Sequence, residues 1–354
     1  MPAAARSGRN HRDPEGSSAM HKAWVIHDYT GFEGLSLEQF PTQDPGPGEV
    51  RLRIEAFALN WGDMDLMENR YSFSFSAFPA RIGMEAAGIV DAVGAGVEGI
   101  EIGARYCTLP HFYDNRGASA ESLVVNARYL TPAPAGLSAV ESASIWMQYL
   151  TAYYPVVELA RAQPGKAILV TAATSTAGSA ALEIGRSCGA TMIGTTRYDY
   201  NKPYLEAAGA DHVIVTDSSG DGVAEQLRTL TGGKGIDAAF DSVGGGLMKE
   251  YVGALAKDAR IFFYGMLDKE FPTIPYAALF QSNALFQAYS VFNYLEDDEH
   301  CPKGIAWVNS ALARGDIKPN IDRVYPMDEY VEACRYLKEP RRSHGKVVIE
   351  TGIT

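Results

Sequence analysis

Residues 166–197 read KAILVTAATSTAGSAALEIGRSCGATMIGTTR: a short apolar run, a turn of small residues, a helical pattern and a second apolar run. The first run, 167–170, is apolar without alternation, which is typical of a parallel strand covered on both faces. The second run, 191–196, follows after roughly 20 residues, as in a strand–helix–strand unit that binds a dinucleotide. The stretch therefore predicts the first half of a nucleotide-binding α/β domain.

The turn between the two runs carries small residues where a dinucleotide-binding turn carries glycines, at Ala172, Ser175 and Gly178. Small side chains let a pyrophosphate approach the backbone N–H groups at a helix N-terminus and let the helix pack closely on its strand. Because Ala and Ser replace two glycines, the motif alone is weak, and a Thr/Ser-rich helix cap would explain it better if nothing followed. The strands and helices that follow favour a dinucleotide, with contacts from Ala172, Ser175, Thr176, Ala177 and Gly178.

The end of the second apolar run indicates which dinucleotide is bound. NAD sites usually carry an acidic residue there for the ribose 2′-hydroxyl, whereas NADP sites need a cation for the 2′-phosphate. The chain reads Thr195-Thr196-Arg197, with Lys202 five residues later and no acid before Asp199. Two solvated surface cations are the plain alternative. In a chain of net charge −12, a local positive pair at this position favours NADPH.

Composition excludes several classes of function. The 354 residues are 46% hydrophobic and 21% charged, which suits two globular domains. An isoelectric point near 5.1 argues against nucleic acid or an anionic membrane as the main partner. No window of about 18 unbroken apolar residues predicts a membrane span. We expect neither nucleic acid nor membrane to be a partner.

Cysteine usage and the first residues bear on localisation. The four cysteines stand alone, without the C-x-x-C spacing of zinc or redox sites, so a disulfide framework is not expected and a reducing cytoplasm fits. Residues 1–20 are polar, with no apolar signal-peptide core, and resemble a disordered leader, an expression scar or a misassigned start.

The order of predicted elements divides the chain into two domains. Short strands before residue 130 suggest a partly open barrel, whereas strands and helices alternate after residue 166, as in a doubly wound parallel sheet. The tail returns to complete the first domain. We expect an α/β protein with a barrel domain over 21–143 and 294–354, and a cofactor domain over 144–293.

The sequence resembles the zinc-free quinone oxidoreductase and enoyl-reductase branch of the medium-chain dehydrogenase/reductase superfamily, from Lys22 onward. The resemblance implies a GroES-like partly open barrel and a Rossmann domain. It rests on GPGEVRLRIEAFALNWGDMD (46–65), FPARIGMEAAGIVDAVGAGV (78–97), PAPAGLSAVESASI (132–145), LTAYYPVVE (150–158), ILVTAATSTAGSAA (168–181), GADHVI (209–214) and GIDAAFDSVGG (235–245).

The sequence departs from the zinc alcohol dehydrogenases of this superfamily at the metal ligands. Their early Cys falls at Leu59-Asn60-Trp61, and their Gly-His-Glu reads Gly83-Met84-Glu85. Met is a poor Zn²⁺ ligand compared with thiolate or imidazole, and the closely spaced cysteines of the structural zinc lobe are missing. We expect no metal site, and therefore no Lewis acid to polarise a substrate oxygen.

Without zinc, hydride from the nicotinamide needs an acceptor that is already electrophilic, such as an enone, an enoyl group or a quinone. The enzyme then positions the acceptor and stabilises the developing enolate. Similarity to the family places Asn60 beside the nicotinamide and Asp63 and Tyr71 near the substrate. A neutral Tyr71 can donate a hydrogen bond or a proton. Tyr71 could equally be one aromatic residue of a flap over the core, and the family's second Tyr is replaced by Asp65.

The resemblance also implies cofactor contacts along the second half of the chain. One lies near the carboxamide, several follow the fourth and fifth strands of the sheet, and two lie in the returning segment. They are Thr151, Ser242, Val243, Gly244, Gly265, Asn293 and Lys346.

Three functions remain open from sequence. The first is an NADPH-dependent reductase of activated alkenes or quinones that acts on a small hydrophobic electrophile. The second is an enoyl reductase for carrier- or CoA-bound acyl chains, which should need a basic docking surface that this acidic chain does not suggest. The third is a non-enzymatic NADPH-binding structural or sensor protein, because fold does not fix function. The family's usual homodimer is the expected assembly.

Overall fold

The computed structural model describes residues 19–111, 115–217, 219–268, 273–340 and 342–353, and the strands among them form three sheets. The leader expected over residues 1–20 lies outside the described residues up to residue 18. The first strand begins at Met20.

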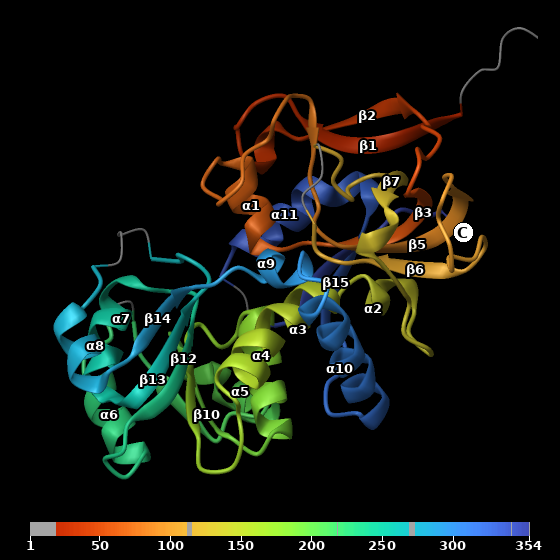
Figure 1. Ribbon diagram of the computed structural model, residues 1–354. Helices are drawn as coiled ribbons and strands as arrows, with labels where there is room; N and C mark the ends of the chain where they lie inside the picture. Colours follow the sequence, from red (N-terminus) through yellow and green to blue (C-terminus); the bar gives the residue numbers. More distant parts are fainter. Residues whose placement is uncertain (1–18, 112–114, 218, 269–272, 341, 354) are drawn as a thin grey trace, which may run out of the picture.

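The second half of the chain builds a six-stranded parallel sheet in the order β11-β10-β9-β12-β13-β14 (Figure 1). Sequence order therefore reverses between β9 and β12, which is the topological switch point of a Rossmann fold. This confirms the predicted doubly wound sheet. The strands are β9 (Ala167–Val170), β10 (Thr191–Thr196), β11 (His212–Val215), β12 (Ile236–Asp241), β13 (Leu255–Phe263) and β14 (Leu285–Ala288).

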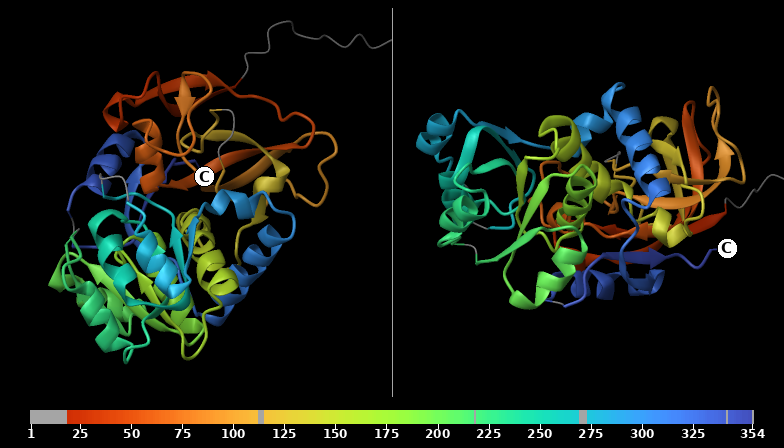
Figure 2. Two further views of the ribbon diagram at one scale, coloured as in Figure 1. Left: turned by 60° about the vertical axis from the view of Figure 1, so that its left-hand side comes forward. Right: turned by 90° about the horizontal axis from the view of Figure 1, so that it is seen from below.

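Helices cover both faces of this sheet (Figures 1 and 2). Ile168 and Val170 of β9 belong to one buried cluster with α4, whereas Leu169 belongs to another with α6 and α7. Burial on both faces explains why the strand is apolar without alternation. The helices are α4 (Thr176–Ser187), α5 (Lys202–Ala207), α6 (Val223–Leu230), α7 (Gly245–Tyr251) and α8 (Tyr276–Ser282).

The first half of the chain and the tail form the GroES-like domain. A small sheet has the order β2-β1-β4, and a seven-stranded sheet has the order β15-β16-β3-β5-β6-β8, with β7 paired to β3. The strands are β1 (Met20–Ile26), β2 (Ser36–Pro41), β3 (Glu49–Ala58), β4 (Ala80–Arg81), β5 (Ala86–Val93), β6 (Arg105–Thr108), β7 (Ser122–Asn126), β8 (Leu130–Pro132), β15 (Ile321–Pro326) and β16 (Lys346–Glu350).

Six further helices accompany these sheets in the described residues. The passage between the domains is helical in separate pieces, and Pro155 lies in the last of them, the π-helix Tyr154–Leu159. The α-helices are α1 (Trp61–Met67), α2 (Ala139–Ser142), α3 (Trp146–Tyr153), α9 (Val291–Leu295), α10 (His300–Arg314) and α11 (Tyr330–Lys338).

One buried cluster continues from the barrel into the parallel sheet. It contains Ala58 and Met84 from the first domain, Trp146 from α3, and Val170 from β9. The two domains therefore share a core. The boundaries at 143/144 and 293/294 remain a proposal.

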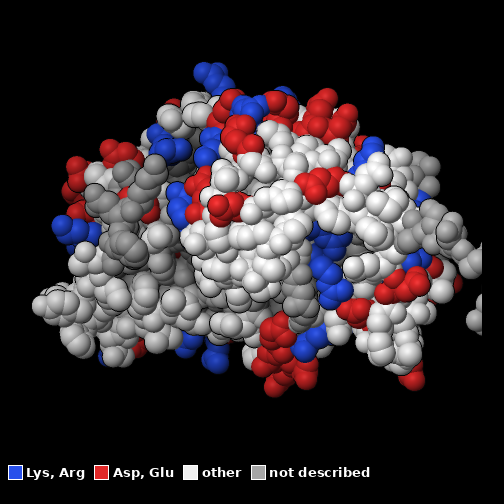
Figure 3. Space-filling model, turned by 90° about the horizontal axis from the view of Figure 1, so that it is seen from above, with Lys and Arg blue, Asp and Glu red and all other residues white. Residues whose placement is uncertain are grey.

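Charged side chains of both signs are spread over the face of the protein seen in Figure 3. Acidic and basic side chains lie side by side on the described part of the face in Figure 3, rather than in one basic stripe. Among the described residues, no helix combines the length and hydropathy needed to cross a membrane.

Candidate functional site

The switch point places two loops side by side at the carboxyl ends of β9 and β12. The hydroxyl of Thr171, directly after β9, donates to Asp241 Oδ1 at 2.7 Å, and the backbone N–H of Ser242 donates to the Thr171 hydroxyl at 3.0 Å. In open α/β sheets, ligands bind in the crevice at this position.

The loop after β9 is shaped by the small residues that the sequence singled out. Ala172 adopts a left-handed φ of 43°, and its N–H donates to the Thr195 hydroxyl at 3.2 Å. Ser175 caps α4 by accepting from the N–H of Gly178 at 3.1 Å. A Cβ on Gly178 would lie 2.8 Å from the Ala173 Cα, so a larger residue would push the helix off the loop. Thr176 and Ala177 form the first turn of α4.

The loop after β12 is organised by Asp241, which the sequence reasoning missed. Its Oδ1 also accepts from the N–H groups of Val243 at 2.8 Å and Gly244 at 3.1 Å, and its Oδ2 accepts from the Tyr251 hydroxyl at 2.8 Å. The carboxylate is buried. An acid at the last position of a predicted buried strand was the available signal, because a buried charge needs several hydrogen-bond partners.

This crevice suits a dinucleotide. Two buried hydroxyls, those of Ser242 and Tyr264, lack a hydrogen-bond partner in the described part of the chain. A Cβ on Gly265 would lie 3.2 Å from the Cβ of Ser242, so the end of β13 closes against the β12 loop. The orphaned hydroxyls and the N-terminus of α4 offer donors of the kind that a pyrophosphate and ribose use.

A cluster of cations and aromatic rings follows β10. The rings of Tyr198 and Tyr200 stack at 5.1 Å, the Arg197 guanidinium lies 5.7 Å from the Tyr198 ring, and the Arg342 guanidinium lies 5.0 Å from the Tyr200 ring. Arg342 was missed because it is 145 positions from Arg197 in the sequence. Lys202, also expected at the 2′-phosphate, pairs its ammonium with Asp199 at 2.6 Å.

The remaining expected cofactor residues lie on two helices and at the end of β10. Thr151 lies on α3 and is buried, with its hydroxyl 3.7 Å from the Met147 sulfur. Asn293 lies on α9 and is exposed. Thr195 and Thr196 close β10, and the Thr196 hydroxyl accepts from the Asn201 side chain at 2.8 Å.

A buried ion pair fixes the expected catalytic asparagine. The Lys346 ammonium donates to Glu85 Oε1 and to Asn60 Oδ1, each at 2.5 Å, and Glu85 Oε2 accepts from the N–H of Met147 at 2.8 Å. The side chains of Lys346 and Glu85 are 1% and 0% exposed. The structure therefore groups Lys346 with Asn60, whereas the resemblance implied a contact near the phosphates.

Asp63 has a capping role in the structure. Its Oδ2 accepts from the N–H of Asn60 at 2.8 Å, and the two residues form the capping box of α1. Burial raises the pKa of Asp63 to about 7, against the opposing effects of the Asn60 hydrogen bond and the Lys346 charge. Burial, and then the charge of Asp63, raise the pKa of the Cys334 thiol on α11. Because Cys334 is buried in the domain core, Asp63 lies beside this core.

The aromatic loop over residues 71–80 has two parts. Tyr71 packs on α1, because a Cβ on Gly62 would lie 2.9 Å from the Tyr71 ring, and Phe73 contacts Tyr71 and Phe292 of α9. Later in the loop, Phe75 packs on Tyr29 instead. Burial, then the charges of two nearby aspartates, raise the pKa of Tyr71, so its phenol is neutral. These contacts show how the loop packs on α1, α9 and Tyr29, and the role of Tyr71 toward a substrate stays a prediction.

Within the described ranges, no group of three or more His, Cys, Asp or Glu side chains is arranged to hold a metal ion. Met84, which stands at the position of the zinc-binding His, is buried in the shared core.

Comparison with known families gives two matches. The profile described as "Alcohol dehydrogenase GroES-like domain" matches residues 46–135, and the profile described as "Zinc-binding dehydrogenase" matches residues 177–310. Together they match more than half of the chain.

Two curated relatives differ greatly in length. The 2-haloacrylate reductase of a Burkholderia species is 27% identical over 336 residues, which cover 93% of this chain and 99% of that protein. The mycocerosic acid synthase-like polyketide synthase of Mycolicibacterium smegmatis is 29% identical over 330 residues. This chain spans only 15% of the length of the synthase.

Two solved structures share the fold over nearly the whole chain. A mycobacterial protein complexed with NADPH has a TM-score of 0.85 and 25% identity, covering 93% of this chain and 99% of that one. The crystal structure of 2-haloacrylate reductase has a TM-score of 0.81 and 26% identity, covering 94% of this chain and 100% of that one.

The raised pKa of Asp63 predicts a specific pH dependence of stability. Between the unfolded pKa of about 3.9 and the folded value of about 7, the folded state holds more protons, so the free energy of unfolding falls as pH rises. Asp63→Asn removes this fall and keeps an acceptor for the Asn60 N–H. Urea unfolding should be measured from about pH 4 to about pH 8. Over this range the free energy of unfolding of Asp63→Asn should rise relative to that of the wild type by roughly 1.4 kcal/mol per unit of pKa shift.

The exposed Asp221 provides the matched control, because Asp221→Asn makes the same change of charge on the surface. If the free energies of unfolding of Asp63→Asn and the wild type differed by the same amount at every pH, the pKa of Asp63 would not be raised by folding.

Proposed function

The chain belongs to the medium-chain dehydrogenase/reductase superfamily, and from this premise we propose that it is a metal-independent, NADPH-dependent reductase of activated C=C bonds or quinones. The observation that carries the proposal is the buried Lys346–Glu85–Asn60 group, which occupies the region of the zinc ligands with hydrogen-bonding side chains. A substrate that is already electrophilic needs no metal there.

The cofactor assignment is supported by the cations after β10. Arg197 lies over Tyr198 and Arg342 over Tyr200, the two rings of one stack, and a guanidinium fork matches a phosphate better than an ammonium does. The NADPH complex of the mycobacterial neighbour supports the same cofactor. The α4 turn and the loop after Asp241 would hold the pyrophosphate and ribose, and the reduced nicotinamide supplies the hydride when it is bound.

The protein's own residues then orient and protonate the acceptor. Asn60, fixed by Lys346, positions the nicotinamide end of the crevice. The neutral Tyr71 phenol donates a hydrogen bond to the substrate oxygen and stabilises the charge that develops there. Tyr71, Phe73 and Phe292 provide an aromatic wall that favours a small hydrophobic substrate and excludes water.

A second candidate is reduction of enoyl thioesters, which is favoured by the match to polyketide synthases. A panel of enones, quinones and enoyl thioesters, followed by loss of NADPH absorbance, tests both enzymatic proposals. NADPH binding without turnover of any member of the panel would favour the non-enzymatic alternative.

The edge of the parallel sheet supports a homodimer as the assembly. β14 is the outermost strand on its side, and an unpaired edge strand is a template for pairing with another chain. The neighbouring helix α8 exposes Tyr276 at 70% and Phe280 at 80%, which is typical of an interface rather than of a solvent-facing helix.

Arg197→Ala should raise the Kd for NADPH roughly tenfold or more and leave the Kd for NADH nearly unchanged, because one charge-assisted hydrogen bond contributes about 1.5–3 kcal/mol. Fluorescence titration of both cofactors measures this. Arg314→Ala on α10 is the control for loss of a surface cation. Equal affinities of the wild type for NADPH and NADH would contradict the assignment.

Tyr71→Phe should lower kcat for an enone, with the Kd for NADPH unchanged, because a preorganised donor to an oxyanion contributes up to about 10²–10³ in rate. A quinone, which depends less on a protein proton donor, should be affected less. Tyr325→Phe, which removes a phenol hydroxyl on β15, is the control. Normal turnover by Tyr71→Phe on every substrate would mean that Tyr71 only packs, and Asn60 would be tested next.

Phe280→Asp should convert the dimer to a monomer in sedimentation experiments, because it buries a charge in an apolar interface. Ile102→Asp, at an exposed apolar residue of the barrel domain, should leave the assembly unchanged. A wild-type protein that sediments as a monomer would refute the dimer.

A further inference from the structure

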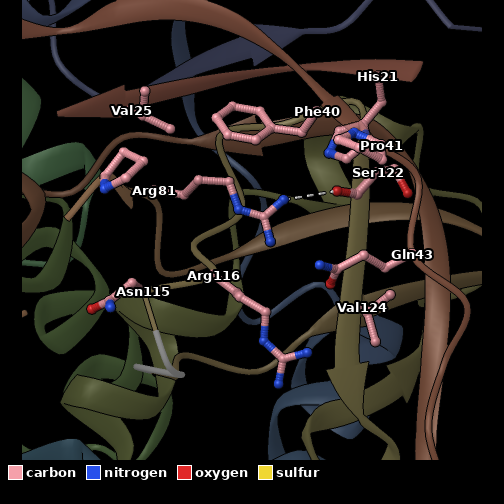
Figure 4. A pocket seen from close by; sticks show the side chains of 11 residues that line it. His21, Val25, Phe40, Pro41, Gln43, Arg81, Asn115, Arg116, Ser122 and Val124 are labelled. Atoms are coloured by element: carbon pink, nitrogen blue, oxygen red, sulfur yellow. Dashed lines mark hydrogen bonds between the residues drawn. The ribbon is translucent and has the colours of Figure 1, made fainter. Parts of the chain in front are cut away.

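A pocket of about 240 Å³ lies in the barrel domain between the small sheet and β7 (Figure 4). Its size suits a small molecule rather than a dinucleotide, because sites for drug-sized ligands begin at about 300 Å³. It shares no residue with the candidate functional site. We call it the Arg81 pocket; it is lined by His21, Val25, Phe40, Pro41, Gln43, Pro79, Arg81, Asn115, Arg116, Ser122 and Val124.

Arg81 is a partly buried cation that has no carboxylate partner among the residues that the structure describes. Its guanidinium donates to the backbone oxygen of Ser122 at 3.2 Å, and it forms no ion pair with any described residue. Burial, and then the nearby Arg116 charge, lower its pKa to about 10, with no acid acting in the opposite direction. A buried charge without a counterion is costly, so an anion in this pocket would be strongly favoured.

The other polar groups of the Arg81 pocket add donors but do not cancel its charge. Arg116 lies across the pocket and pairs with Glu49 at 3.0 Å, so that carboxylate is already engaged. The exposed Gln43 directs its amide toward the space between the two guanidinium groups (Figure 4). Burial, then the Arg81 charge, lower the pKa of His21 against the opposing charge of Glu121, so this wall residue is neutral near pH 7. Glu121 itself accepts from the N–H of Lys22 at 2.6 Å.

We propose that the Arg81 pocket binds a small oxyanion, a phosphate or a carboxylate, held by the Arg81 guanidinium and reached by Arg116 and Gln43. A guanidinium fork binds either group through two parallel hydrogen bonds. Phe40, Val25 and Pro79 form the apolar side of the pocket, so a carboxylate with a small apolar group fits the same space.

Isothermal titration of the NADPH-saturated protein tests this, since the phosphate-binding crevice is then filled. The probes are inorganic phosphate, acetate and benzoate, each against chloride at the same ionic strength. We expect saturable binding of at least one probe. Tighter phosphate binding would identify the ligand as a phosphate, and tighter benzoate binding would identify it as a carboxylate with an apolar group.

Two variants locate the binding. Gln43→Glu places a carboxylate at the exposed rim of the pocket, where it can neutralise Arg81, and Arg81→Met removes the charge. Each should raise the Kd of the bound probe at least about tenfold, the effect of losing one charge-assisted hydrogen bond. Gln39→Glu, on the same strand region but outside the pocket, adds the same charge and should not change the Kd.

The proposal is overturned if no probe binds the wild type, or if Gln43→Glu binds the probe as tightly as Gln39→Glu does. Because Gln43 and Gln39 are both exposed, both variants should fold, and the comparison does not depend on the stability of Arg81→Met.

Discussion

The buried ammonium of Lys346 joins the parts of the protein that build the candidate site. It lies at the start of β16 and contacts Asn60, at the start of α1, and Glu85, just before β5. Glu85 in turn accepts from the N–H of Met147 on α3, which belongs to the passage between the domains. A buried ion pair is costly to form and more costly to break, since removing one partner leaves the other charge uncompensated. The position of Asn60 therefore depends on the whole group.

The parallel sheet also has a buried charge that is held by several hydrogen bonds, at its switch point. Asp241 joins the loops after β9 and β12 through Thr171 and the N–H groups of Val243 and Gly244. In both places a buried charge is satisfied by groups from segments far apart in the sequence. Such a group specifies one arrangement of loops, because any other arrangement leaves polar atoms unpaired in the core. Each network thus fixes the loops that it joins.

The elements that sequence predicted well are those with local causes. The apolar run of β9 and the doubly wound parallel sheet followed from residue type and spacing alone. The partners of Lys346 and the approach of Arg342 to Tyr200 depend on the tertiary fold, so no local pattern could reveal them. The pairing of Lys202 with Asp199 is local and could have been foreseen from their spacing of three residues.

The shared core also limits how the site can exclude water. Ala58 and Met84 pack in the same buried cluster as Trp146 and Val170, so a rotation of one domain against the other would expose apolar surface at about 25 cal/mol per Å². Movement of the loop over residues 71–80 exposes far less, because Phe73 already lies near the surface and contacts Phe292 through the edge of one ring. Under the proposed function, closure around a substrate would therefore be cheapest at this loop, which carries both Phe73 and the proposed donor, Tyr71.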